Sequence, residues 1–228
     1  MQKKISLSII IPVRNEASHL PSLLNALQKR KSDNTEVIVV DGCSEDDTLN
    51  VICHKKNRIL HSEPGRAQQM NTGARHAKGK YLWFLHADSK VDFDFESIIE
   101  SGLKNKKWGW FNVRLSNTKI IFRVIESMMN YRSKITSVAT GDQGIFIHKN
   151  IFIEQGLFPS IALMEDVRFS KKIRSSESPF ISDTPLETSA RRWEEDGPIR
   201  TIFKMWTLRL LFFLGASPNW LNKQYNKK

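Results

Sequence analysis

The chain has 228 residues, 40% of them apolar, and its 35 Lys and Arg against 24 Asp and Glu give a formal charge of +11 at pH 7. This length suits one domain with an appendage, and the composition is not that of a disordered chain. The two cysteines, Cys43 and Cys53, suggest neither a disulfide framework nor a zinc site, and this cysteine usage fits a reducing cytosol. The charge favours anionic partners such as phosphorylated substrates, acidic lipids or nucleic acid, but a simple soluble basic surface explains it equally well.

The first part of the chain alternates β-branched runs with helical segments. Strands are predicted at residues 5–13, 36–40, 58–61 and 81–85. The first run follows lysines, as in a secretory signal, but it ends in Pro12 without a small-residue cleavage site, so we predict a buried strand. Strand–helix alternation of this kind predicts a parallel sheet covered by helices on both faces.

Three signals predict the helices between these strands. Leucines recur at positions 20, 23, 24 and 27, on one helix face, and a further apolar stripe from Ala67 to Ala77 predicts a helix that Gly79 ends. Ser44 followed by Asp47 has the form of a capping box and predicts a helix running toward Lys55.

The second half is less regular. A long apolar-periodic segment covers about residues 119–137, a strand is predicted at 144–148, a helix begins near Glu165, and a weak strand covers 180–188. No linker is visible, so we predict one domain over residues 1–198, followed by an amphipathic, apolar helical tail over 199–228.

Two carboxylates follow directly on predicted strands. Asp41 ends the run 36–40, and Asp88 follows the run beginning at Tyr81. Ligands of open parallel sheets bind beyond the carboxyl ends of the strands, so both side chains are expected at one edge, near Gly42 and Arg66. A strand-terminal Asp commonly forms a turn, but a pair on one edge also suits a divalent cation bound with substrate phosphates.

Several segments together resemble family 2 glycosyltransferases. They are SIIIPVRNE (8–16), EVIVVDGCSEDDT (36–48), GKYLWFLHADS (79–89), GDQGIFIHK (141–149), MEDVRFSKKIR (164–174) and RRWEEDG (191–197). The resemblance implies an α/β GT-A fold: a mostly parallel mixed sheet flanked by helices, with a Rossmann-like nucleotide-sugar-binding half (1–90) and an acceptor half (91–198).

The resemblance also assigns the donor-binding residues. Pro12, Arg14 and Glu16 would line the nucleotide pocket, and Asp41 would hydrogen-bond the base. Arg66 would reach the base or the phosphates, unless it is a solvated arginine at a helix start.

The metal-binding D-x-D motif of the family reads His86-Ala87-Asp88 here. Asp88 is therefore the expected ligand of Mn²⁺ or Mg²⁺. His86 suits Mn²⁺ better than Mg²⁺, and it can instead hydrogen-bond the ribose or simply pack at the strand end.

Glu165 and Asp166 resemble the family's acidic pair. The resemblance makes Asp166 the catalytic base of an inverting enzyme and lets Glu165 orient the base or the acceptor. Without it, acids at a helix start need no catalytic purpose, because the helix dipole favours them.

Further donor or acceptor contacts are expected from two other motifs. Arg191 and Arg192 precede Trp193 as in the Q-x-x-R-W motif of processive members, but Ser189 replaces the Gln, so we predict a non-processive enzyme. The two arginines are expected to clamp the diphosphate, unless they are surface residues. Asp142 and Gln143 are assigned to the acceptor or diphosphate side.

The tail sequence IRTIFKMWTLRLLFFLGA (199–216) is apolar and basic. Arg200, Lys204 and Arg209 argue against a membrane span. An interfacial helix on anionic lipid and a helix that packs on the domain and shapes the acceptor site both remain open. The tail also resembles a small subgroup whose acceptors are apolar, such as carotenoid acids.

The resemblance, together with these residues, implies an inverting, non-processive glycosyltransferase that moves a sugar from a nucleotide-diphosphate donor to an acceptor hydroxyl or carboxylate, with a lipid or carotenoid-type acceptor. The expected location is the cytoplasm, with peripheral contact to the inner face of the membrane. The alternative is a non-catalytic nucleotide-sugar-binding or membrane-surface scaffold. No nucleic-acid-binding module is recognisable, so nucleic acid is not an expected partner.

Overall fold

The computed structural model describes residues 4–53 and 57–227. Its strands are β1 (Leu7–Val13), β2 (Thr35–Asp41), β3 (Arg58–His61), β4 (Tyr81–Phe84), β5 (Trp108–Leu115), β6 (Phe146–His148) and β7 (Phe180–Thr188). Its helices are α1 (Leu20–Arg30), α2 (Thr48–Cys53), α3 (Arg66–His76), α4 (Phe95–Asn105), α5 (Ile120–Thr136), α6 (Lys149–Glu154), α7 (Glu165–Ile173), α8 (Arg191–Asp196), α9 (Pro198–Phe213) and α10 (Pro218–Asn226), with a short 3₁₀ turn, η1 (Gly141–Gln143).

The strands form one seven-stranded sheet in the order β3-β2-β1-β4-β6-β5-β7. β1 pairs in parallel with β2 and β4, β2 with β3, and β5 with β7, whereas β6 runs antiparallel to both of its neighbours. The interior strand β1 is buried along almost its whole length, which is why its sequence reads as a nearly continuous apolar run. The predicted mostly parallel mixed sheet is confirmed.

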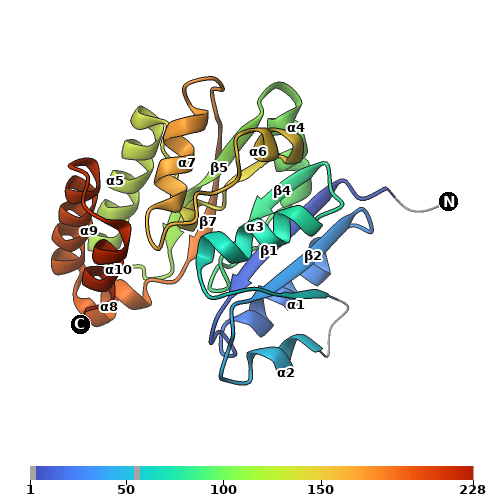
Figure 1. Cartoon of the computed structure of the whole chain (residues 1–228), viewed down its shortest axis with the longest axis horizontal. Helices are drawn as coiled ribbons and strands as arrows, with labels where there is room; N and C mark the ends of the chain where they lie inside the picture. The colour runs from blue at the N-terminus through green and yellow to red at the C-terminus, as the bar shows by residue number, and fades with distance from the viewer. Residues whose placement is uncertain (1–3, 54–56, 228) are drawn as a thin grey trace.

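Helices cover both faces of the sheet (Figure 1). The apolar residues of α1, α2 and α4 pack on one face, around Ile9, Ile11 and Trp83. Those of α3, α6 and α7 pack on the other face, around Ile10 and Leu82. Alternate residues of β1 and β4 therefore face opposite layers, as the alternation of side chains along a strand requires.

Two local predictions in the first half were wrong. α2 begins only at Thr48, whose N–H donates to the Asp46 carboxylate at 3.0 Å, and the Ser44 hydroxyl instead accepts the N–H of Asn15 at 3.0 Å. Ser44 thus joins two loops, and it does not cap the helix; Lys55, toward which the helix was expected to run, lies outside the described residues. Gly79 does not end α3: a Cβ there would lie 2.6 Å from the backbone nitrogen of Ser8, so only glycine allows this close approach.

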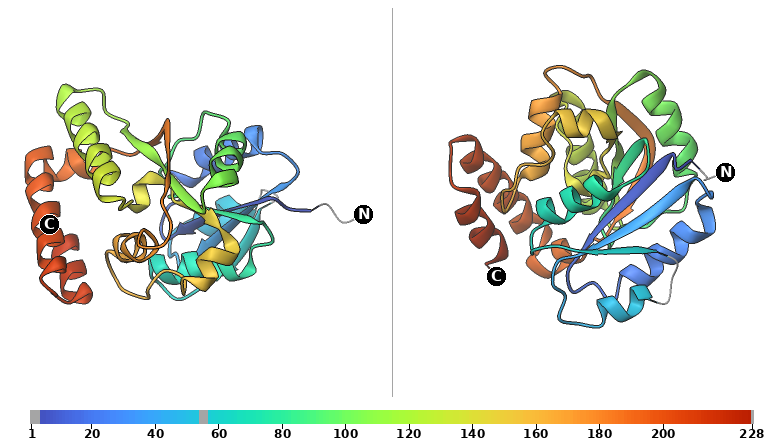
Figure 2. Two further views of the ribbon diagram at one scale, coloured as in Figure 1. Left: turned by 90° about the horizontal axis from the view of Figure 1, so that it is seen from above. Right: turned by 45° about the vertical axis from the view of Figure 1, so that its right-hand side comes forward.

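The C-terminal helices pack on the end of the molecule far from the N-terminus, beside α5 (Figures 1 and 2). Leu208 of α9 and Leu221 of α10 are buried against Met164 and Val167, which flank the acidic pair at the start of α7. Of the two readings of the tail, packing on the domain is therefore present in the structure. Among the described residues, no helix combines the length and the apolar character needed to cross a membrane.

Candidate active site

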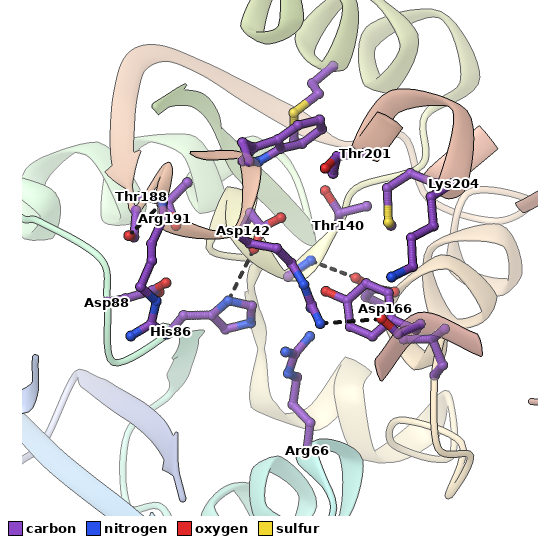
Figure 3. Close-up of a pocket in the computed structure, with 18 of the residues that line it drawn as sticks. Arg66, His86, Asp88, Thr140, Asp142, Asp166, Thr188, Arg191, Thr201 and Lys204 are labelled. Atoms are coloured by element: carbon purple, nitrogen blue, oxygen red, sulfur yellow. Dashed lines mark hydrogen bonds and ion pairs between the residues drawn. The ribbon is translucent and has the colours of Figure 1, made fainter. Parts of the chain in front are cut away.

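A cavity of about 1020 Å³ opens beyond the carboxyl ends of β1, β4, β5 and β7. Its wall contains eleven of the residues singled out from the sequence: Pro12, Arg14, Glu16, Arg66, His86, Asp88, Asp142, Glu165, Asp166, Arg191 and Arg192. Figure 3 shows Arg66, Asp142, Asp166 and Arg191 converging on this space from different elements. The cavity thus lies at the edge of the sheet where ligands of parallel sheets are expected to bind.

Asp41 and Gln143 do not line the cavity. Asp41 is buried at the end of β2, where its carboxylate accepts the N–H of Ser44 at 3.2 Å and lies 3.7 Å from Nδ1 of His61. Gln143 is fully buried, and its Oε1 accepts hydrogen bonds from the Ser133 hydroxyl at 2.8 Å and from the Thr140 N–H at 3.0 Å. The contacts of both side chains shape the loops around the site.

Asp166 lies at the start of α7, 9% exposed, on the wall of the cavity. Its Oδ2 accepts the N–H of Gly141 at 2.6 Å, and its Oδ1 accepts the N–H of Val167 at 2.6 Å. Met164 enters the helix in the left-handed conformation, with φ +68°, and thereby aims the two following acids inward. The Asp166 carboxylate is thus held by main-chain donors, so its position does not depend on a flexible partner.

Glu165 is more deeply buried and faces Arg66. Its Oε1 lies 3.9 Å from Nη1 of Arg66 and has no hydrogen-bond partner. Burial, and after it the charge of Asp166, raises the pKa of Glu165, while Arg66 offsets part of this effect. Burial, the largest single effect, lowers the pKa of Arg66, but the charges of Glu165, Tyr225, Asp142 and Asp166 together outweigh it, and the net direction is upward. The guanidinium, 46% exposed toward the cavity, is therefore a permanent cation there.

His86 and Asp142 form a pair across the cavity wall. Nδ1 of His86 lies 3.3 Å from Oδ1 of Asp142, and Nε2 is buried without a hydrogen-bond partner (Figure 3). A Cβ added at Gly141 would lie 2.6 Å from that Nε2. Burial by itself raises the pKa of Asp142. The hydrogen bond with His86 and the charges of His86, Arg66 and Arg132 together outweigh burial, so the net shift of this pKa is downward.

Glu16 and Asp88 bring two further carboxylates to the cavity wall. Burial, and then the charge of Asp88, raises the pKa of Glu16, whereas His19 and Arg191 act in the other direction. Two acids that repel each other in this way, beside the cation of Arg191, form a position where an additional positive charge is favourable.

The structure adds three site residues that the sequence patterns did not indicate. Arg132 of α5 lines the cavity, and although burial lowers its pKa, it lies close enough to Asp166 and Asp142 for their charges to oppose that shift. Tyr225 of α10 carries the Arg192 guanidinium over its ring at 3.7 Å. Lys204 of α9 donates to the carbonyl of Lys227 at 2.9 Å. Arg132 lies within a segment that reads only as an apolar-periodic helix, and Tyr225 belongs to no motif.

Replacing Glu165 with glutamine is expected to stabilise the protein at neutral pH but not in acid. The raised pKa means that the folded state holds this proton more tightly than the unfolded chain, so the carboxyl group favours folding below its ordinary pKa of 4.5 and disfavours it as pH rises through the raised value. Arg66, half exposed, loses little when its distant partner becomes neutral. Thermal unfolding between about pH 4 and pH 8 tests this, with the exposed Glu154→Gln as control. A Tm difference that does not change with pH contradicts the prediction.

Known proteins that resemble this chain indicate its family and its fold. The model described as "Glycosyl transferase family 2" matches residues 8–160. An uncharacterized glycosyltransferase of Haemophilus influenzae is 37% identical over 91 residues, covering 36% of this chain and 29% of that protein. The poly(ribitol-phosphate) beta-N-acetylglucosaminyltransferase TarS of Staphylococcus aureus is 29% identical over 94 residues, covering 37% of this chain and 16% of its own length. The matched segments thus cover less than a third of these relatives.

Two solved structures share the fold. TarS residues 1–349 with UDP-GlcNAc superpose with a TM-score of 0.68 at 20% identity, covering 81% of this chain and 58% of that one. A mannosyltransferase of Pyrobaculum calidifontis, in complex with GDP-Man and Mn²⁺, has a TM-score of 0.63 at 20% identity, covering 79% and 56%. The fold is that of the GT-A glycosyltransferases, and, because the family match covers more than half of the chain, the chain belongs to glycosyl transferase family 2.

Proposed function

We propose that the protein is an inverting, non-processive glycosyltransferase that moves a sugar from a nucleotide-diphosphate donor to an acceptor hydroxyl or carboxylate. The observation that carries the proposal is the Asp166 carboxylate, fixed by the Gly141 N–H at 2.6 Å on the wall of a cavity that has cationic and apolar sides. The complexes of the structural relatives with UDP-GlcNAc and GDP-Man support a nucleotide sugar as donor.

The cations of the cavity suit the donor's diphosphate. Arg191 and Arg192 lie at the start of α8, and Arg66 at the start of α3, so three guanidinium groups point into one space. Guanidinium forks bind phosphate oxygens in a bidentate manner, and the stacking of Arg192 on Tyr225 limits its freedom before the donor arrives. Pro12, Arg14 and Glu16 border the same side and are assigned to the nucleotide. Asp41 is also assigned to the nucleotide base, although its side chain lies outside the cavity wall.

Asp166 is assigned the role of general base. It would accept the proton of the acceptor hydroxyl as the acceptor oxygen forms a bond to the anomeric carbon and the bond to the diphosphate breaks. An acceptor carboxylate brings no proton, and Asp166 would then only position it. Attack from the side opposite the leaving group inverts the anomeric centre. Glu165, which faces Arg66, would orient Asp166 or the acceptor, and Asp142 and Gln143 would hold the loop that supplies the Gly141 N–H.

A divalent cation, Mn²⁺ or Mg²⁺, fits the acids on the donor side. Among the described residues, no three or more His, Cys, Asp or Glu side chains form a group that could hold a metal by themselves. However, such cations use one or two carboxylates and complete their shell with substrate phosphate oxygens and water. We therefore propose Asp88, with Glu16 beside it, as the protein's contribution, and the bound cation would neutralise charge on the diphosphate leaving group. His86 is less suited, because its nitrogens face Asp142 and Gly141.

The acceptor side of the cavity is apolar. It is lined by Met128 and Met129 of α5 and by Ile202, Met205 and Trp206 of α9. This lining supports the proposal of a lipid or carotenoid-type acceptor. We also propose a cytoplasmic location with peripheral contact to the inner face of the membrane.

Incubation with UDP-, GDP- and dTDP-sugars and Mn²⁺ tests the proposal. Without an acceptor, the protein is expected to hydrolyse its donor slowly and to gain thermal stability from it, because binding to the native state raises the unfolding temperature. The absence of both effects across the panel would contradict the proposal. Binding of a nucleotide diphosphate without any turnover would favour the alternative, a non-catalytic nucleotide-sugar-binding scaffold.

A further inference from the structure

Two helices beside the cavity expose apolar stripes that no part of the described chain covers. On α5 the stripe consists of Ile120, Val124, Met128, Tyr131 and Ile135, and on α9 of Ile199, Phe203, Trp206, Leu210 and Phe213. Within each helix these residues recur at intervals of three or four, so each set lies on a single face. Every one of the ten side chains is at least 40% exposed. We call the two stripes together the apolar face.

The apolar face continues into the cavity. Met128 and Tyr131 from α5 and Trp206 from α9 belong both to the exposed stripes and to the cavity lining. Figures 1 and 2 show α5 and α9 side by side at one end of the molecule. The apolar face and the cavity that contains Asp166 therefore share these three side chains.

Basic residues outnumber acids on the two helices that carry the apolar face, although Nζ of Lys204 lies 3.9 Å from the carboxylate of Asp196 on α8. No Asp or Glu follows Asp196 in the sequence, whereas Arg200, Lys204 and Arg209 lie on α9. The one acid of α5, Glu126, is buried and lies 2.9 Å from Nη2 of Arg123. The Nζ of Lys171 lies 3.3 Å from the ring centroid of Phe213. This region thus combines exposed aromatic and aliphatic side chains with a strong local positive charge.

We infer that the apolar face docks on the surface of an anionic lipid bilayer, with α5 and α9 lying in the headgroup region, and that the acceptor enters the cavity from the lipid between them. Helices with Trp, Phe and Leu on one face and Lys and Arg around it bind such interfaces, and the positive charge adds attraction to acidic headgroups. A second copy of the chain is the less suitable occupant, because pairing through this face would bring two basic regions together. The entry of the acceptor rests on the proposed function, whereas the docking itself does not.

Co-sedimentation with vesicles tests the docking. The full chain is expected to bind vesicles of phosphatidylglycerol and phosphatidylcholine, and to bind vesicles of phosphatidylcholine alone much more weakly. The double variants Phe203→Gln/Leu210→Gln on α9 and Ile120→Gln/Val124→Gln on α5 are each expected to lose about tenfold or more in partitioning. Ile153→Gln on α6, where the replaced side chain is also 50% exposed but lies away from the face, is the matched control and keeps full binding.

Two further measurements separate the possible outcomes. A photoactivatable phospholipid in the vesicles is expected to label α5 and α9, and labelling confined to other elements overturns the inference. The inference is also overturned if the wild-type chain does not bind the vesicles, or if both double variants bind them as the wild-type chain does. A wild-type dimer that both double variants convert to monomer overturns it as well. Donor hydrolysis by every variant is expected to match that of the wild-type chain. If vesicle binding persists while hydrolysis is absent from all of them, the proposed enzymatic function fails and the docking stands.

Discussion

Replacing Asp166 with asparagine is expected to lower the rate constant for sugar transfer to a hydroxyl acceptor by roughly 10²–10⁴-fold, the usual contribution of a positioned general base. Asparagine has nearly the same shape, and its carbonyl oxygen still accepts the Gly141 N–H, but it does not take up the acceptor's proton. The cationic residues of the donor side are untouched, so affinity for the nucleotide sugar is expected to stay near that of the wild-type protein. Transfer kinetics under saturating donor, combined with direct donor-binding measurements, test both parts.

Asp183→Asn is the matched control, because Asp183 is an exposed carboxylate on β7 that does not line the cavity. It is expected to leave transfer unchanged. Loss of donor binding in Asp166→Asn, in proportion to the loss of transfer, would remove Asp166 from the role of base and place it among the donor contacts.

Replacing Asp88 with asparagine is expected to lower transfer by about a hundredfold or more and to raise the Mn²⁺ concentration needed for half-maximal rate. Asp88 is the carboxylate proposed to hold the cation, and charge neutralisation of a leaving diphosphate is worth several kcal/mol. The amide of asparagine is a much weaker ligand for a hard cation than a carboxylate. Activity titrations with Mn²⁺ and Mg²⁺, before and after chelation, give both quantities.

Two variants sharpen the interpretation of Asp88. Asp92→Asn changes an exposed acid four residues further along and is expected to have no effect. Glu16→Gln removes the neighbouring charge and is expected to weaken the metal dependence less than Asp88→Asn does. A residual activity of Asp88→Asn that keeps the wild-type Mn²⁺ dependence would contradict the metal role of Asp88.

Several elements could be predicted because their signals are local. The strands at the start of the chain are continuous apolar runs, since a parallel strand between two helical layers is buried on both faces. The predicted segment 119–137 corresponds to α5, the helix near Glu165 to α7, and the strand 180–188 to β7. The division between a domain over residues 1–198 and a tail over 199–228 stays a prediction. The helices α9 and α10 of that tail pack against α7, so the structure shows no separation between the two parts.

Other elements were missed for identifiable reasons. α4 has a usable start signal, Asp94, which accepts the N–H of Ser97 at 3.2 Å, but no motif drew attention to it. β5 contains Gly109, which reads as a turn residue. In the structure this glycine is needed because a Cβ there would lie 2.3 Å from the carbonyl oxygen of Phe180 on β7. A close approach between strands far apart in sequence leaves no local pattern.

The sequence by itself determined the fold class, the family and the strand-end positions of most site residues, because each depends on the order and periodicity of side chains along the chain. Tertiary structure alone decided which groups meet. His86 contacts Asp142, Arg66 faces Glu165, and Arg132 and Tyr225 enter the site only because helices from distant segments pack around one sheet edge. The apolar face arose in the same way: each stripe is periodic by itself, but only packing places the two on either side of the cavity mouth. Contacts of this kind depend on strand order and helix placement, which local sequence patterns do not encode.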